Sequence, residues 1–231
     1  MQGSTSLSKP LLWLSAHPTG ARLAAILFMP AIAVLMTKIV VSMQATVITH
    51  SSPEQLLSIA LFLFCIELAW MAYVDLRNAA LVASLLSSPA THLPDVPPLD
   101  TCSPTESTKE IALLNRFFSV VVSTVVLELV GFYAALFSLL VGAVLVIVSQ
   151  LWFNLLAGVA LYPAQSPPVV LFRPKDRVDV LSANCAALFS LSLWPLFGMR
   201  LSAAISLLLL ITLFLTLKYV PLAYRKLSER P

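Results

Sequence analysis

The sequence predicts an all-α, polytopic integral membrane protein, and its composition is the first reason. Of the 231 residues, 59% are hydrophobic and only 11% are charged, and the mean hydropathy is +0.92. A soluble domain carries about 25% charged residues. Apolar stretches of about 18 residues or more, long enough to cross a bilayer, recur along the chain. In water they would leave large apolar patches exposed, so a lipid bilayer is the expected solvent.

The continuity of these apolar runs is the second reason. Lipid offers no partner to backbone polar groups, so only helices and closed β-barrels can span a membrane. Barrel strands alternate in polarity over about ten residues. Here the runs are continuous and rich in Leu, Ala and Val. They therefore favour a bundle of about six transmembrane helices.

The chain order of polar and apolar segments predicts the domain organisation. Residues 1–22 form an uncleaved N-terminal interfacial arm, and residues 23–220 form one transmembrane helical domain. A solvated, proline-rich loop is expected over 87–110, and a basic cytoplasmic tail over 221–231. The predicted spans are residues 23–47, 53–74, 111–132, 135–161, 180–197 and 201–220.

Local signals set the boundaries of these spans. Ser52 and Pro53 fit the start of the second helix, and Ser107 with Glu110 fits a capping box before the third. The apolar segment 111–162 would make a helix of about 78 Å at 1.5 Å per residue, more than twice the thickness of a hydrocarbon core. It must turn, and Gly131 is the predicted place.

The distribution of basic residues predicts that both termini lie in the cytoplasm. With six spans, Arg200 falls outside and Lys38 lies within a span, so 12 of the 14 Lys and Arg residues lie on the inner side. Cytoplasmic loops of membrane proteins carry this excess of positive charge. If 111–162 were a single span, the bias would weaken. Six spans fit the sequence better.

Three ionisable residues are predicted at membrane depth: Lys38, Glu67 and Glu128. A charge there is costly and usually faces a partner or water. Depth, counted from the predicted span ends, places Lys38 level with Glu128 and Glu67 level with Arg116. Glu67 reaching toward Arg77 at the interface is the alternative. Fixed ion pairs joining helices, a proton or ion relay, a polar substrate site and snorkelling are the interpretations that remain open.

Two amides complete the set of candidate polar residues. Gln150 and Asn154 are four residues apart, so they share one face of the fourth span. Hydrogen bonding between helices is the expected role of such side chains. The full candidate set is Lys38, Glu67, Glu128, Arg116, Gln150 and Asn154.

Missing motifs narrow the function. Motifs of zinc proteases, P-loop nucleotide-binding proteins and serine hydrolases do not occur, which argues against an enzyme. All three histidines lie outside the predicted spans, so a bis-histidine haem site is not expected. The sequence indicates no metal, no other cofactor, no disulfide framework and no nucleic-acid partner, whereas pigment or lipid binding stays open.

The leading functional hypothesis is an accessory, assembly or scaffolding subunit of a larger membrane complex. Its expected partners are the lipid bilayer and other membrane proteins or further copies of the chain. A small transporter or channel using Lys38, Glu67 and Glu128 is the alternative. The expected location is a bacterial inner membrane or an internal organellar membrane such as the thylakoid.

Overall fold

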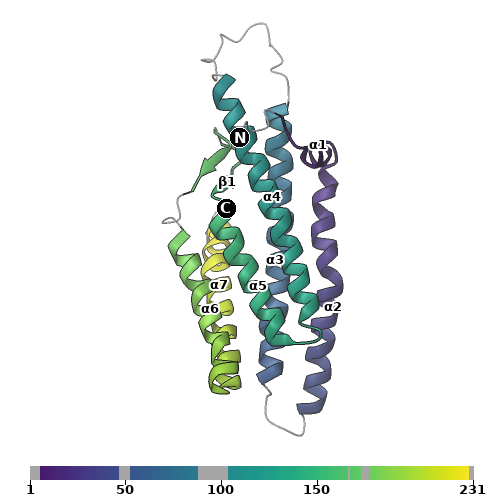
Figure 1. Ribbon diagram of the computed structural model, residues 1–231, viewed down its shortest axis with the longest axis vertical. Helices are drawn as coiled ribbons and strands as arrows, with labels where there is room; N and C mark the ends of the chain where they lie inside the picture. The colour runs from purple at the N-terminus through teal and green to yellow at the C-terminus, as the bar shows by residue number, and fades with distance from the viewer. Residues whose placement is uncertain (1–5, 47–52, 88–103, 166, 173–176, 229–231) are drawn as a thin grey trace. The chain divides into compact units, whose positions relative to one another are not determined.

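The computed structural model describes residues 6–46, 53–87, 104–165, 167–172 and 177–228. In these segments the chain forms seven α-helices, one 3-10 helix and two short strands (Figure 1). They are α1 Lys9–Ala16, η1 Pro18–Gly20, α2 Ala21–Thr46, α3 Pro53–Ser87, α4 Pro104–Ala134, α5 Leu139–Leu156, β1 Val159–Leu161, β2 Val169–Leu171, α6 Val178–Phe197 and α7 Arg200–Ser228. Six of the helices, α2 to α7, are long and apolar enough to cross a membrane. The prediction of an all-α bundle with six spans is confirmed.

Contacts divide the chain into two compact units. Unit 1 comprises Met1–Leu27, Ala69–Val126 and Leu151–Val178, and unit 2 comprises Phe28–Leu68, Leu127–Gln150 and Asp179–Pro231.

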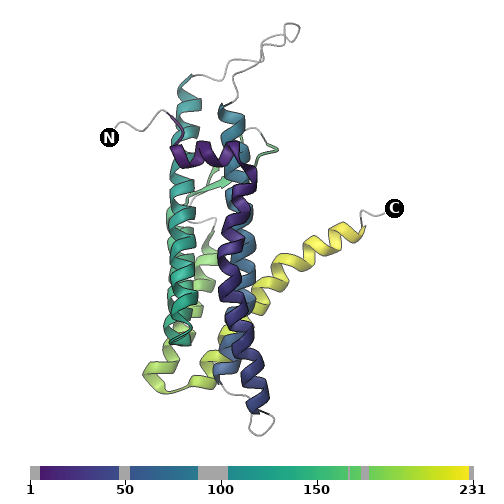
Figure 2. The same ribbon diagram turned by 90° about the vertical axis from the view of Figure 1, so that its right-hand side faces the viewer.

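In unit 1 the N-terminal segment packs on α4. The side chains of Leu11 and Leu14 in α1 are buried. Asn115 of α4 holds the chain just before α1 through two hydrogen bonds: its Oδ1 accepts from the Ser8 N–H at 2.8 Å, and its Nδ2 donates to the Ser6 carbonyl at 2.9 Å. Figure 2 shows α1 running crosswise to the start of α2. Within the described part of the predicted arm, residues Lys9–Ala16 therefore form a helix.

Unit 1 also contains the β1–β2 hairpin, which corrects the predicted fourth span. The expected helix over 135–161 ends at Leu156, and Val159 pairs with Leu171 in an antiparallel ladder. Gly158 ends the helical path because its φ of +59° is in the left-handed region that favours glycine.

Unit 2 contains the hairpin of α4 and α5, and its turn is not at the predicted residue. The chain turns after Ala134. Ser138 directly precedes α5, and its hydroxyl oxygen accepts a hydrogen bond from the Val141 N–H at 3.4 Å. Gly131 lies inside α4, where an added Cβ would meet Val146 Cγ2 of α5 at 2.7 Å. This glycine permits close helix packing and does not make the turn.

Three other helices differ in length from the prediction. α3 continues past the predicted end of its span at 74 to Ser87, a continuation that residues 76–86 allow because no proline or glycine interrupts the segment after Asp75. α7 passes through Pro221 and includes most of the predicted tail. α4 starts at Pro104, so Ser107 lies within the helix instead of capping it, since proline suits the first helical position. The predicted cap Ser52 and most of the proline-rich loop lie outside the described residues.

Candidate functional site

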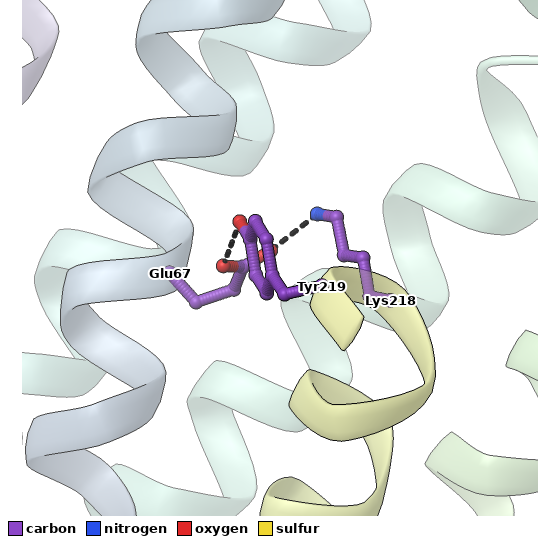
Figure 3. Close-up of polar contacts among 3 residues, drawn as sticks. All are labelled: Glu67, Lys218 and Tyr219. Atoms are coloured by element: carbon purple, nitrogen blue, oxygen red, sulfur yellow. Dashed lines mark hydrogen bonds and ion pairs between the residues drawn. The ribbon is translucent and has the colours of Figure 1, made fainter. Parts of the chain in front are cut away.

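Among the residues that the structure describes, a polar cluster within the membrane-spanning helices surrounds Glu67 of α3 in unit 2. Its side chain is only 5% exposed. The Lys218 ammonium donates to Oε1 of Glu67, and the Tyr219 hydroxyl donates to Oε2 at 2.6 Å. Figure 3 shows both carboxylate oxygens engaged by these consecutive residues of α7. The cluster therefore ties α7 to α3 through an ion pair and a hydrogen bond from a neutral hydroxyl to the charged carboxylate.

The path of α7 explains how two consecutive residues can hold one carboxylate. Neighbouring residues on a helix point about 100° apart, so they can straddle a side chain of a helix that crosses obliquely. Figure 2 shows α7 running obliquely to α3. The Lys218 ammonium also lies 5.3 Å from the Tyr219 ring centroid and 5.8 Å from that of Phe214. These rings add cation–π attraction to the ion pair.

Glu67 binds neither of its predicted partners, Arg116 and Arg77, because Lys218 and Tyr219 occupy its carboxylate. Arg116 of α4 is exposed, and its Nη2 donates to the Leu156 carbonyl at 3.1 Å. That carbonyl is at the C-terminal end of α5, where a cation is favoured by the helix dipole. Depth counted along the sequence missed Lys218 because it lies close to the end of its span. The only hint of this contact in the sequence was the pair Lys218 and Tyr219, which lies within one helical turn before Pro221.

Glu128, the second buried carboxylate, is bound by one of the predicted amides. Gln150 Nε2 of α5 donates to Glu128 Oε1 of α4, and the Glu128 side chain is buried. Both residues lie in the part of the α4–α5 hairpin, Leu127–Gln150, that belongs to unit 2. A carboxylate–amide contact thus links the two helices well away from their turn.

Lys38 of α2 does not take Glu128 as its partner, contrary to the predicted pairing. Its ammonium donates to the carbonyls of Ala135 at 2.8 Å and Leu136 at 3.0 Å. Because α4 continues to Ala134, its C-terminal carbonyls reach Lys38, whereas Glu128 lies seven residues earlier, about 10 Å back along the helix. Lys38 therefore caps the negative end of α4, where lysine is favourable.

Asn154, the second amide, belongs to a different cluster, in unit 1, around Arg177. Arg177 donates to Asn154 Oδ1 at 3.3 Å and to the Val159 carbonyl at 3.4 Å. Its guanidinium lies 4.9 Å from the ring centroid of Phe172 and 5.6 Å from that of Phe153. The sequence showed Arg177 only as one of many inner-side cations. Its aromatic neighbours come together only through the β-hairpin.

Burial lowers the pKa of Arg177, and the charge of Asp75 together with Tyr162 acts in the opposite direction. An arginine stays protonated in proteins despite such a shift. Arg177 is therefore a permanent, half-buried cation that joins the end of α5 to β1.

Replacing Arg177 with Lys should destabilise the protein by about 1–3 kcal/mol, because an ammonium cannot bond both acceptors and stack on two rings with the same geometry. Thermal unfolding in detergent measures the effect. Arg200→Lys is the matched control, since the Arg200 guanidinium lies 5.8 Å from one ring centroid, that of Trp194, at an exposed position. Equal losses for the two variants would contradict a special role for Arg177.

Comparison of this chain with protein-family models, curated proteins and solved structures finds no match.

Proposed function

We propose that the protein is an accessory or scaffolding subunit that binds another membrane protein through the outward face of α6. The observation that carries this proposal is the row formed by Ser182, Cys185 and Ala186. These residues are exposed and lie at helical spacing on the first half of α6. Small residues allow a second helix backbone to approach closely in a bilayer, where packing drives helix association.

The neighbouring helix gives the contrast. The exposed face of α7 carries Leu209, Leu213 and Leu217, which are bulky side chains suited to lipid tails. Small exposed residues on α6 bury little area against disordered lipid, but they suit a complementary helix. The small row on the first half of α6, between the exposed Val178 and Phe189, therefore favours a different neighbour from the exposed face of α7.

The polar clusters support a structural interpretation of the buried charges. The Glu67 carboxylate is bound on both oxygens from α7, and Glu128 is bound from α5. Lys38 is occupied by helix-end carbonyls. Contacts of this kind hold helices together. A rigid bundle of this sort suits a protein that presents a fixed surface to a binding partner.

A photo-crosslinking residue at position 186, installed in native membranes, should give one discrete adduct with a second protein. Position 187 is the matched control, because Ala187 is the same residue type on the adjacent, buried side of α6. Position 213 on α7 should give lipid adducts. If position 186 also yields lipid adducts alone, the proposed interface is wrong.

The Glu67 cluster specifically favours a second candidate function, proton or cation transport, because ionisable groups at membrane depth often serve as relays. Proteoliposomes under an imposed pH gradient would test it. Proton flux that Glu67→Gln abolishes, together with lipid adducts alone at position 186, would favour transport over scaffolding.

A further inference from the structure

The short helix α1 has two apolar faces, and only one of them is covered. Leu11 and Leu14 are buried within unit 1. Leu12 and Trp13 are 43% and 51% exposed, and with Lys9 and Ala16 they form the outward stripe at spacings of three and four residues. Such an arrangement is typical of a helix lying in a membrane interface.

The outward stripe is held in a defined place next to a membrane span. The two hydrogen bonds of Asn115 fix the start of α1 on α4. The Trp13 ring stacks on His17 with centroids 5.0 Å apart, and a Cβ at Gly20 would come within 2.9 Å of it. The span of α2 begins at Ala21, one residue later. Trp13 must therefore lie close to the level where the chain enters the bilayer.

The segment that contains α1 and the start of α2 carries only positive charges. Lys9 and Arg22 are exposed, and no Asp or Glu precedes Glu54 in the chain. An interface built from Leu, Trp and cations is complementary to phospholipid headgroups that carry a net negative charge. The predicted cytoplasmic position of the N-terminus agrees with this chemistry, because anionic lipids are concentrated in that leaflet.

We propose that α1 is an interfacial helix that places Leu12 and Trp13 among the headgroups and binds anionic phospholipid through Lys9 and Arg22. The exposed side chains of Leu12 and Trp13 supply apolar burial, and the two cations supply selectivity for negative headgroups. This site is independent of the outward face of α6, which belongs to unit 2.

Brominated phospholipids test the proposal with the full-length protein reconstituted in phosphatidylcholine bilayers. The difference in fluorescence quenching between the wild type and Trp13→Phe isolates the signal of Trp13. Brominated phosphatidylglycerol should quench Trp13 more than the same fraction of brominated phosphatidylcholine does. Each of Lys9→Gln and Arg22→Gln should lower this preference by up to about fivefold, the equivalent of ~1 kcal/mol per basic residue near an anionic surface.

Arg200→Gln is the matched control, because Arg200 is also an exposed cation beside a tryptophan, Trp194, but it starts a different helix. The lipid preference at Trp13 should be unchanged in this variant. Equal quenching by the two lipids would refute anionic selectivity, and no quenching by either would refute the interfacial position. If the glutamine variants unfold, the wild type still decides: the preference must fall as salt rises, and a salt-independent preference overturns the role of the cations.

Discussion

Lys218→Met is expected to destabilise the protein by about 3–5 kcal/mol, the usual cost of leaving a buried charge without its ionic partner. Glu67 is 5% exposed, so its carboxylate would keep the Tyr219 hydroxyl but lose the compensating cation. Glu67→Leu should cost less. Lys218 is 27% exposed and lies three residues from the end of its span at Pro221, so its ammonium can reach the interface.

The double variant Glu67→Leu/Lys218→Met should recover most of the loss, because replacing both partners of a buried pair by apolar residues is often neutral. Thermal stability of the four proteins in detergent gives the coupling free energy. Tyr219→Phe serves as the control. It removes one hydrogen bond to a charged group and should cost about 1.5–3 kcal/mol. Additive losses for Glu67 and Lys218 would contradict the contact.

The contact between α3 and α7 marks the limit of what the sequence could predict. Composition and continuous apolar runs predicted the bilayer, the helices and the number of spans. Which basic residue meets a buried carboxylate depends on where each helix ends and how it tilts. Counting residues from the predicted span ends gives neither the true helix end nor the tilt. Glu67 was therefore assigned to Arg116, whereas the oblique path of α7 brings Lys218 to it.

For the ionisable residues within the spans, the sequence predicted the need for a partner but not which partner each would have. Burial cost alone predicted that Lys38, Glu67 and Glu128 need partners, and each has a bonded neighbour. The neighbours of Lys38 could not be predicted from residue types, because its ammonium binds two backbone carbonyls. Every residue carries such a carbonyl, so nothing in the sequence distinguishes Ala135 and Leu136 until the end of α4 is known.

Glycine positions were ambiguous for a physical reason. A glycine after a long apolar run suits a turn, but it equally suits a place where two helices touch. Gly131 is of the second kind, and its counterpart Gly142 lies on the other helix of the hairpin. A motif such as G-x-x-x-G detects two glycines on one helix. It cannot detect one glycine on each of two helices.

Gly142→Ala should destabilise the protein by about 1–3 kcal/mol, the usual cost of overpacking. The added Cβ would lie 2.6 Å from both the Cα and the backbone nitrogen of Ala135, and backbone atoms cannot move aside as a flexible side chain can. The sign of the effect is diagnostic. In a helix without a close neighbour, the same change stabilises by roughly 0.5–1 kcal/mol, because glycine is a poor helix former.

Two matched variants separate this clash from other effects of the substitution. Gly198→Ala changes the same residue type where nothing lies within 4 Å but φ is +66°, so its cost should be only the backbone strain of about 1–2 kcal/mol. Adding Ala135→Gly to Gly142→Ala removes the opposing Cβ and leaves the backbone contacts. It should therefore restore only part of the lost stability. Thermal unfolding in detergent measures all three. A stabilising Gly142→Ala would mean that α4 and α5 do not approach closely beside their turn.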